Sequence, residues 1–599
     1  MAINSRIHQS NAWTGIIWPV LLLLLLVGCG GPSPVTTPTP TPTLPSLLQF
    51  TTFDLHLPAA ALSAPIVGPL PDDTPLHVNI SFKANQQVLD QLNQKKVPKG
   101  QNQNLPDLAN KLGISDSEYQ QLQAFFGVEH ASLNLNKLHT DLTVDAKARS
   151  FARLFQVKFL LHKLNGRTFY TPDRNPQVPT FIANRILAIT GLDNYSIPPR
   201  TGSLAQHHQL KTAGARKSPA ADCDIPRGLL TWRDVAHLYG YDQLRKAGLD
   251  GKGITINLIE IDPFSQAEVQ NYASCVYYQG TVKVVNVGNP PGKEEGESAL
   301  DIEMIMGLAP AANIVDYQTD ISHAQSDSAY YTLLNDELLR LIDDNTKNTS
   351  SGSLVSISLE ASEIFTTTGD IAAIDQSLQI LTKAEHMTVF IASSDCGAFM
   401  SGIYDVLSVS FPASDPSAVA VGGTVAVVDQ KTNTLSEHVW SNGSDHSKCT
   451  NQWGSGGGLS YAFKRPAWQI GQGVQNKYSN GARQVPDVSA LAWNLATYYQ
   501  GYGWVLNGGT SAATPIWASG MALVNEGLIQ QTHSFFYGPD LFYTVAQVGA
   551  KEHVQPYHDV TQGNNLYYPA TPGWDFATGF GTPNLPDFYK TLLAMAKQS

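Results

Sequence analysis

The chain has 599 residues, 42% of them hydrophobic and 15% charged, with 48 Gly and 36 Pro. This length predicts two or three domains, and the composition favours a loop-rich extracellular protein over a helical cytosolic one. Residues 1–223 contain 19 Lys and Arg against 13 Asp and Glu, a charge of +6; the net charge of −12 leaves −18 for residues 224–599. The acidic larger part excludes a nucleic-acid-binding protein. The opposite charges either attract each other or belong to two unrelated solvated surfaces.

The N-terminus predicts export with a lipid anchor. Arg6 is the only charged residue before an apolar run over residues 16–27, which is shorter than the roughly 20 residues that span a bilayer. Residues 1–28 are therefore predicted to be a signal peptide. The sequence LVGC ending at Cys29 resembles the lipobox of bacterial lipoproteins, which implies that Cys29 is lipidated and begins the mature chain. A plain signal peptide with an incidental Cys is the alternative.

Composition divides the following residues into three segments. Residues 29–49 are rich in Pro and Thr, which favour an extended, semi-rigid tether. Residues 50–200 mix strand-like and helical patterns and predict an α+β domain. Residues 201–223 are polar, without a core pattern, and predict an exposed linker where proteases cut. In the α+β domain we expect strands at 76–82 and 167–172, and helices at 85–92, 115–126 and 144–156.

Residues 224–599 alternate apolar strand-like runs with helical segments, which predicts an α/β domain built on a parallel sheet. The expected strands are 254–261, 282–287, 314–317, 354–358, 388–393 and 418–421, and the expected helices include 297–306 and 371–384. Four cysteines remain besides Cys29: Cys223, Cys275, Cys396 and Cys449. In an exported protein they can pair in three ways or stay as free thiols.

The first segment with chemical potential is GGTSAATP at residues 508–515. The glycines permit a tight turn before Ser511, and the small residues after it predict a closely packed helix. A serine at a helix N-terminus is exposed to unpaired N–H groups and to the positive end of the helix dipole. None of the 16 His residues is followed by Gly, which argues against the His-containing triad of a subtilisin.

Two carboxylates supply a candidate base in place of His. Glu297 and Asp301 are four residues apart and share one face of a predicted helix. Crowded or buried carboxyl groups have raised pKa values and can share a proton. The residues alone favour a solvated acidic helix start over this pair, since Glu294 and Glu295 precede them. A third carboxylate, Asp395, follows a buried strand-like run in the turn SSDCG, where a capping role is the simple alternative.

Together these motifs resemble the sedolisin family of serine-carboxyl peptidases, with a kumamolisin-like arrangement. The resemblance implies a subtilisin-like, parallel-sheet catalytic domain after an α+β activation prodomain. It assigns Ser511 as the nucleophile, Glu297 as its general base, and Asp301 as the residue that orients Glu297. Asp395 takes the position of the oxyanion-hole carboxyl group, although Ser394 and Cys396 replace the Gly and Ser usual in that turn.

The resemblance also implies one structural calcium ion. Two carboxylates and several turn carbonyls near residues 559–583 suit a hard cation, although ordinary Asp turns explain them equally well. The family's ligands fall on Asp559, Val560, Thr571, Gly573 and Asp575, where Thr571 replaces a usual Gly. Glu260 matches a carboxylate that extends the acidic network in some members, whereas Leu359 lacks the side-chain donor found there.

The implied activity is hydrolysis of protein or peptide substrates at acidic pH by an autoprocessed endopeptidase precursor. Its other partners are its own prodomain, as intramolecular inhibitor and chaperone, and the membrane, through Cys29 before processing; we expect a monomer. The alternatives are a tripeptidyl-exopeptidase and an exported binding protein that keeps the fold without the chemistry. A subtilisin-type enzyme or a lipoprotein adhesin has less support in the sequence.

Overall fold

The computed structural model describes residues 48–101, 104–164, 166–196, 223–292, 294–320, 328–401, 406–429, 434–443, 452–499 and 503–598. These residues belong to one compact unit, 44–599. The predicted signal peptide, Cys29, nearly all of the predicted tether and residues 201–222 of the predicted linker lie outside the described residues. Within the described part, no helix is both long and apolar enough to cross a bilayer.

Residues 48–196, called here the N-terminal domain, form an α+β structure with its own apolar core. Two antiparallel sheets have the strand orders β10-β3-β6-β5 and β2-β7-β8, and β1 pairs with β9. The strands are β1 (Phe50–Thr52), β2 (Ile66–Pro69), β3 (Pro75–Phe82), β4 (Val97–Pro98), β5 (Ser132–Leu135), β6 (Asp141–Lys147), β7 (Phe159–Leu164), β8 (Arg167–Pro172), β9 (Gln177–Pro179) and β10 (Ile186–Thr190). The helices are α1 (Ala59–Ser63), α2 (Gln86–Leu92), α3 (Ala109–Leu112), α4 (Asp116–Gly127), α5 (Ala148–Leu154) and α6 (Thr180–Ala183), with a 3₁₀ turn, η1, at Leu105–Leu108.

Residues 223–598, the C-terminal domain, are built on an eight-stranded sheet with the order β12-β13-β11-β14-β16-β18-β19, in which β22 also pairs with β18. All pairs are parallel except β18 with β19. The strands are β11 (Thr255–Glu260), β12 (Val282–Asn286), β13 (Asn313–Gln318), β14 (Leu354–Ile357), β16 (Thr388–Ala392), β18 (Val419–Asp429), β19 (Thr434–Val439) and β22 (Val488–Leu491). This confirms the predicted α/β class.

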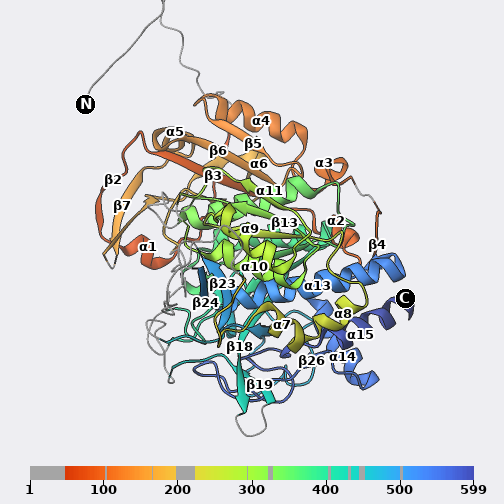
Figure 1. Cartoon of the computed structure of the whole chain (residues 1–599). Helices are drawn as coiled ribbons and strands as arrows, with labels where there is room; N and C mark the ends of the chain where they lie inside the picture. The colour runs from red at the N-terminus through yellow and green to blue at the C-terminus, as the bar shows by residue number, and fades with distance from the viewer. Residues whose placement is uncertain are drawn as a thin grey trace, which may run out of the picture. The chain divides into compact units, whose positions relative to one another are not determined.

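Two apolar cores cover the two faces of this sheet because successive strand residues point to opposite sides. One core joins the sheet to α10 (Glu297–Leu308) and α13 (Thr510–Thr532), which lie next to each other (Figure 1). The other joins it to α11 (Ser328–Asn345) and α12 (Thr368–Gln379). Both central helices are predominantly buried, as expected for a layer between the sheet and other elements.

The other helices of the C-terminal domain are α7 (Trp232–Tyr239), α8 (Tyr241–Lys246), α9 (Gln266–Val276), α14 (Asp540–Glu552) and α15 (Leu585–Gln598), with short turns η2 (Glu363–Phe365) and η3 (Ile380–Ala384). Short strands form β-pairs outside the main sheet: β15 (Ala361–Ser362), β17 (Ser410–Phe411), β20 (Gly458–Lys464), β21 (Ala482–Val485), β23 (Leu495–Tyr499), β24 (Gly503–Asn507), β25 (Ser534–Phe535), β26 (Tyr557–His558) and β27 (Thr582–Pro583).

One predicted element is wrong in part. The amphipathic pattern over residues 144–156 predicts a single helix, but its first residues belong to strand β6 and only α5 is helical. Val144 pairs with Val78 of β3 and packs in the core of the N-terminal domain, so pairing within the sheet overrides the local pattern. In contrast, the Ser115 and Glu118 start signal forms the expected capping box at α4.

The N-terminal domain docks on the α11 and α12 face of the C-terminal domain. Its Leu89, Leu92 and Leu138 join the core that contains these two helices. The Gln376 side chain of α12 accepts from the Ala84 main-chain N–H at 2.8 Å and donates to the Phe82 carbonyl at 2.8 Å. Strand β4 also pairs with β25. The docking thus combines apolar burial with two hydrogen bonds from the Gln376 side chain and with the pairing of β4 and β25.

Charged contacts across this interface differ in their response to acid. His77 lies between Asp145 of its own domain, at 2.6 Å, and Asp336 of α11, at 2.7 Å. Burial opposes the charge on His77, but the carboxylates of Asp336 and Asp145 outweigh it and raise the pKa of His77 to about 10. Elsewhere Asp193 faces Asp370 of α12. Burial, with a smaller effect of Asp370, raises the pKa of Asp193 to about 7.

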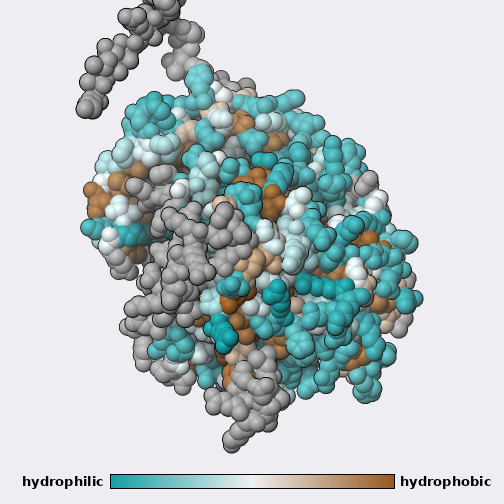
Figure 2. Space-filling model, in the orientation of Figure 1, coloured by the Kyte–Doolittle hydropathy of each residue, from teal (hydrophilic) through white to brown (hydrophobic). Residues whose placement is uncertain are grey.

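Cys223 forms a disulfide with Cys275 of α9, which selects among the pairings that the sequence leaves open. Cys396 is also disulfide-bonded, and Cys449 lies outside the described residues. The face of the molecule in Figure 2 is mainly hydrophilic, with hydrophobic residues in small scattered groups.

Candidate active site

The sequence-predicted catalytic residues meet at the carboxyl ends of neighbouring parallel strands, where α/β folds place their sites. Strands β11, β14 and β16 run side by side, and Asp262, Ser358 and Asp395 lie one to three residues beyond their respective ends. Helix α13 brings Ser511 to the same edge, because the Ser358 hydroxyl lies 3.3 Å from the Ser511 main-chain oxygen.

Asp262 determines where helix α10 begins. Its Oδ2 accepts from the main-chain N–H groups of Glu295 and Gly296, each at 2.8 Å, and its Oδ1 accepts from that of Ser298 at 3.1 Å. Gly296 adopts a φ of +98°, which suits glycine. A carboxylate on the unpaired N–H groups of a helix start is favourable. Asp262 therefore positions Glu297, the first residue of α10.

Glu297 and Asp301 lie on the face of α10 that approaches Ser511. Asp301 is fully buried, and its Oδ2 accepts from the Ser358 hydroxyl at 2.5 Å. Burial raises the pKa of Asp301 to about 8, although hydrogen bonds with Ser358 and Glu260 act in the opposite direction. Burial, and then the Asp301 carboxylate, raise the pKa of Glu297 well above its ordinary value, while a hydrogen bond with Ser511 lowers it. The pair therefore holds at least one proton in acid.

Ser511 is the second residue of α13 and is partly exposed. Gly509 before the helix adopts a φ of +105°. A Cβ at this position would lie 2.7 Å from Asp395 Oδ2, so a side chain here would collide with the predicted oxyanion-hole group. Both the backbone angle at residue 509 and the lack of room for a side chain beside Asp395 therefore require glycine in the turn before Ser511.

Asp395 lies against the start of α13. Its Oδ1 accepts from the Thr510 main-chain N–H at 2.7 Å and from the Thr510 hydroxyl at 2.8 Å. Burial raises the pKa of Asp395 to about 6, and the two Thr510 hydrogen bonds limit the increase. In acid this carboxyl group is protonated and can donate a hydrogen bond, which is what an oxyanion requires.

Glu260 joins the acidic set from the end of β11. Its side chain is fully buried and hydrogen-bonded with Asp301. No other described residue donates to either of its carboxyl oxygens. Two carboxyl groups in contact need a shared proton, and burial, followed by the charge of Asp301, raises the pKa of Glu260 well above its ordinary value. The extended network is thus present although Leu359 contributes no donor.

Three residues in this site escape the sequence reasoning: Asp262, Ser358 and Glu360. Glu360 Oε2 accepts from the Asp395 main-chain N–H at 3.0 Å. All three follow the ends of central strands. The available signal was the rule that α/β folds place their sites beyond the carboxyl ends of parallel strands. That rule marks positions, but it does not indicate which polar residue at a strand end faces the site.

The predicted calcium ligands gather on one loop. Asp575 Oδ2 accepts from the Thr571 N–H at 2.7 Å, and Asp559 Oδ2 accepts from the Gly573 N–H at 2.8 Å. Val560, the remaining predicted ligand, is buried beside Asp559. Burial raises the pKa of Asp575 to about 7, and within the described chain neither carboxylate has a cationic side-chain partner. Two partly desolvated carboxylates on one turn form a hard oxygen donor set, which fits calcium.

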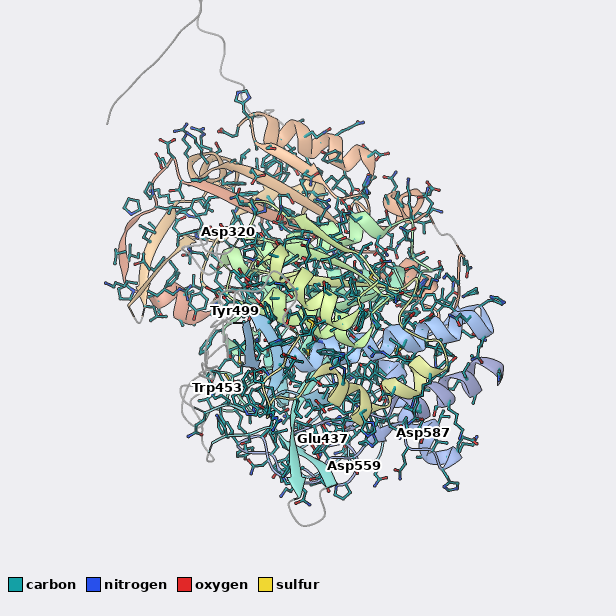
Figure 3. All side chains as sticks on the ribbon, viewed as in Figure 1. Asp320, Glu437, Trp453, Tyr499, Asp559 and Asp587 are labelled. Carbon is teal, nitrogen blue, oxygen red and sulfur yellow. A yellow bond between two sulfur atoms is a disulfide. The ribbon has the colours of Figure 1, made fainter. Side chains whose placement is uncertain are left out.

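No described cluster of three or more His, Cys, Asp or Glu side chains could hold a metal ion. The calcium prediction therefore depends on main-chain carbonyls as well as on two carboxylates. Figure 3 shows Asp559 well separated from Tyr499, whose ring packs against Gly296 at the start of α10. A cation at this loop would therefore stabilise the fold without contacting the reacting atoms.

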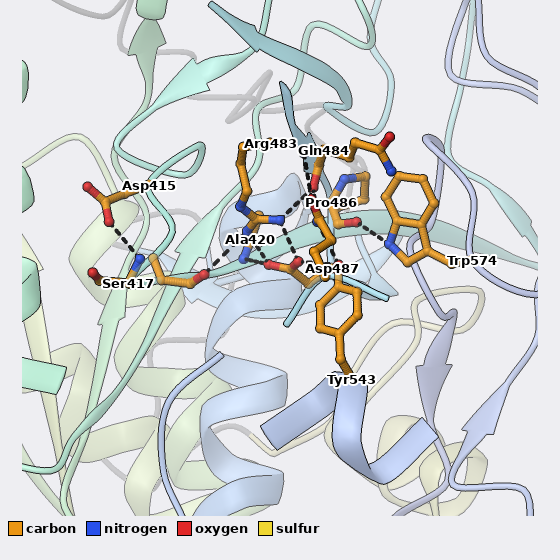
Figure 4. A network of polar contacts seen from close by, with 11 residues as sticks. Asp415, Ser417, Ala420, Arg483, Gln484, Pro486, Asp487, Tyr543 and Trp574 are labelled. Atoms are coloured by element: carbon orange, nitrogen blue, oxygen red, sulfur yellow. Dashed lines mark hydrogen bonds and ion pairs between the residues drawn. The ribbon is translucent and has the colours of Figure 1, made fainter. Parts of the chain in front are cut away.

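A buried ion pair lies near Trp574 of this loop (Figure 4). Arg483 donates to both carboxylate oxygens of Asp487, at 2.7 and 2.6 Å, and both side chains are fully buried. Asp487 also accepts from the Tyr543 hydroxyl at 2.7 Å, and the Trp574 indole N–H donates to the Pro486 carbonyl at 3.1 Å. Breaking such a pair from one side is costly because it leaves an uncompensated buried charge. It links β21 and β22 to the predicted calcium loop.

Comparison with known proteins agrees with this geometry. The family model described as Pro-kumamolisin, activation domain, matches residues 65–195. Kumamolisin of Bacillus sp. (strain MN-32) is 30% identical over 519 residues, which cover 81% of this chain and 85% of kumamolisin. Sedolisin of Pseudomonas sp. (strain 101) is 24% identical over 464 residues, covering 74% and 73% of the two chains. A solved structure of Pseudomonas sedolisin, a serine-carboxyl proteinase, is 25% identical with a TM-score of 0.50, covering 59% of this chain and 96% of that one.

The chain belongs to the sedolisin family of serine-carboxyl peptidases, as a kumamolisin-like member with an N-terminal activation domain. It is thus a serine-type peptidase, and the family and fold predictions are confirmed. Tripeptidyl-peptidase 1 of Homo sapiens is also similar, 30% identical over 245 residues that cover 35% of this chain and 38% of that protein.

Proposed function

We propose that the chain is the precursor of a secreted, acid-acting serine-carboxyl endopeptidase with Ser511 as nucleophile. The observation that carries this proposal is the contact of Ser511 with Glu297, which is half-buried next to the fully buried Asp301. Among the described residues, the side chains hydrogen-bonded to Glu297 and Asp301 are those of Ser511, Ser358 and Glu260, and none of them is a His. A carboxylate base suits a reaction run at acidic pH.

In the proposed mechanism the Ser511 hydroxyl attacks the carbonyl carbon of the substrate peptide bond, and Glu297 accepts its proton. Protonated Asp395 donates a hydrogen bond to the oxygen that becomes negative. The tetrahedral intermediate collapses when Glu297 returns the proton to the leaving amine, which leaves an ester on Ser511. Water then attacks the carbonyl carbon of this ester while Glu297 accepts a proton from the water. Glu297 returns the proton to the Ser511 oxygen as the ester bond breaks. Asp301 keeps Glu297 oriented and exchanges a proton with it.

Acidic pH is required by Asp395, which must keep a proton. The pKa of Glu297 is raised, so Glu297 acts as the base in acid only while it shares a single proton with Asp301. The pKa of Asp395, raised by burial to about 6, means that Asp395 loses this proton as the pH rises above about 6. We therefore propose an activity that declines between pH 5 and 7 because the oxyanion donor is lost.

The N-terminal activation domain is proposed to inhibit the enzyme until acid releases it. Residues 1–223, which include this domain, carry +6 and residues 224–599 carry −18, which favours association near neutral pH. Acid reduces the negative charge of the C-terminal domain and so weakens this attraction, to which the ion pair of His77 with Asp336 contributes. Protonation of Asp193 and Asp370 acts in the opposite direction, because it removes a repulsion across the interface. We expect the His77 contact and the overall charge to dominate, with cleavage in residues 201–223.

Two further parts of the proposal concern calcium and the membrane. Asp559 and Asp575, with main-chain oxygens of Val560, Thr571 and Gly573, would hold one calcium ion that neutralises the buried carboxylates. Lipidation of Cys29 would anchor the monomeric precursor. Because Cys29 precedes the proposed cleavage region, processing would free the catalytic domain. Mature enzyme that stayed on membranes in high salt would contradict this last step.

A tripeptidyl-exopeptidase is the second candidate, favoured by the similarity to tripeptidyl-peptidase 1. Peptides with a free and with an acetylated N-terminus separate the two, since an exopeptidase of this type needs the free amine. Equal cleavage of both supports the endopeptidase. A peptide aldehyde that fails to inhibit, together with no cleavage of any peptide between pH 3 and 7, would instead support an exported binding protein.

A further inference from the structure

The turn that carries Asp395 is held in an unusual backbone conformation. Ser394 adopts a φ of +106°, in the region that favours glycine, although it has a side chain. Both Ser394 and Asp395 are buried. A residue in such a conformation persists only where its surroundings hold it there. The question is which contacts supply that restraint.

Main-chain contacts hold the carbonyl groups of this turn. The Gly456 N–H donates to the Ser394 carbonyl at 2.7 Å, and the Gly454 N–H donates to the Asp395 carbonyl at 2.9 Å. On the donor side, the Asp395 N–H has one partner among the described residues, Glu360 Oε2 at 3.0 Å. The Ser394 hydroxyl donates to Met400 Sδ at 3.1 Å and accepts from the Cys396 N–H at 3.0 Å, and the Glu360 carboxyl group lies within hydrogen-bonding reach of the same hydroxyl. Glu360 thus contacts both residues of the strained turn.

The sheet explains why Glu360 reaches this turn. Strand β14 pairs in parallel with β16, with Ile357 opposite Ile391. Continuing this register beyond the strand ends places Glu360 beside Ser394. The same loop contains Ser358, which donates to Asp301 at 2.5 Å. This short loop therefore contacts Asp301 of the catalytic carboxyl pair on one side and the turn that carries Asp395 on the other.

The charge state of Glu360 suits this role in acid. Burial, and then the charge of Asp395, raise the pKa of Glu360 to about 8. At pH 4 Glu360 is therefore a neutral acid that can accept from the Asp395 N–H through its carbonyl oxygen. It then places no negative charge beside the developing oxyanion.

We infer that Glu360 is a positioning residue for the oxyanion-hole group. It restrains the Ser394 and Asp395 backbone so that the Asp395 carboxyl group stays against the start of α13, and it compensates for a serine where glycine would be relaxed. This inference rests on the proposed role of Asp395. An oxyanion donor acts on the transition state, so displacement of Asp395 should lower kcat and leave KM nearly unchanged.

The test compares variants of the full-length chain, processed at pH 4, on a chromogenic peptide. E360A removes the hydrogen bonds, and E360M removes them while keeping side-chain volume. Both should lower kcat at least about tenfold with KM within about twofold. E360Q, which can still accept from the Asp395 N–H, should recover most of kcat. In the S394G background, where no strained serine needs restraint, E360A should lose less than about threefold relative to S394G alone.

The same experiment separates the role of Glu360 from that of Asp395. Full activity of Asp395→Ala, which has no donor, would overturn the role of Asp395 itself. If Asp395→Ala is inactive while E360A and E360M keep the parental kcat, the positioning role of Glu360 is wrong and that of Asp395 stands. A loss confined to KM, or an equal loss in the S394G background, would also overturn the inference. If E360A does not fold, E360M and E360Q carry the comparison.

Discussion

Replacement of Asp301 by Asn should change how the stability of the precursor depends on pH. Asn resembles the protonated form of Asp301: it can accept from the Ser358 hydroxyl and donate to Glu260. Burial raises the pKa of Asp301 from 3.8 to about 8, so the folded chain retains a proton that the unfolded chain releases above pH 4. Folding stability from this group is therefore fully present below about pH 4 and is lost as the pH rises toward 8.

The size of the effect follows from the two pKa values. At pH 7.5, keeping a proton on a group with an unfolded pKa of 3.8 costs about 5 kcal/mol if the group titrates alone. Sharing of protons with Glu260 and Glu297 reduces this value, so we expect about 2 to 5 kcal/mol. Asp301→Asn avoids the cost, and the variant should be the more stable protein at pH 7.5 and nearly equal to its parent at pH 4.

The assay is thermal unfolding of the two proteins in a Ser511→Ala background, which prevents self-cleavage. The melting temperatures should agree at pH 4 and differ by on the order of 5 °C at pH 7.5. Asp587→Asn, at a half-buried position near the start of α15, is a control for the Asp to Asn change itself, and its melting curves should run parallel to those of the parent. Parallel melting curves for Asp301→Asn and its parent across this pH range would refute the raised pKa and the proton-sharing pair.

Three other predictions concern separate parts of the molecule. Glu297→Gln should lower kcat on a peptide at pH 4 by at least about 100-fold, because the general base is lost; a loss below tenfold would contradict its role. Removal of calcium by a chelator should destabilise the precursor by up to about 3 kcal/mol, seen as a lower melting temperature, and Asp575→Asn should abolish this response. An equal response in the variant would exclude this loop. Asp336→Asn should speed self-processing at pH 5.5 by weakening the His77 contact, whereas Asp370→Asn should slow it, as followed by gel electrophoresis; effects of the same sign would contradict the proposed interface.

Much of the C-terminal fold follows from local sequence pattern. The apolar runs that predict β11 and β16 are bounded by turn residues and lie in a fully buried parallel sheet, so their length and composition suffice. The segment 144–156 shows the limit: its residues fit a helix by local periodicity, but β3 and β5 on either side of β6 recruit its first part into a sheet. Long-range pairing of this kind leaves no signal in a short window.

The candidate site, too, could be predicted from the sequence only in part. Spacing alone places Glu297 and Asp301 on one face of a helix, but it does not distinguish a solvated face from a buried one. The structure makes that distinction, because α10 is buried against α13 and its start is held by Asp262. Glu360 could not be assigned because its role depends on the register between β14 and β16 and on the backbone angle of Ser394.

Self-processing of the purified chain from residue 30 onward, beside its Ser511→Ala variant, tests the central claim most directly. Both proteins are brought from pH 7 to pH 4, and chain size and casein cleavage are followed over time. The account predicts that the native chain loses its N-terminal domain, a shortening of roughly 20 kDa, and then digests casein, while the variant does neither. Two chains that both stay intact and inert from pH 3 to 7, or a Ser511→Ala chain that processes itself as fast as the native one, would contradict it.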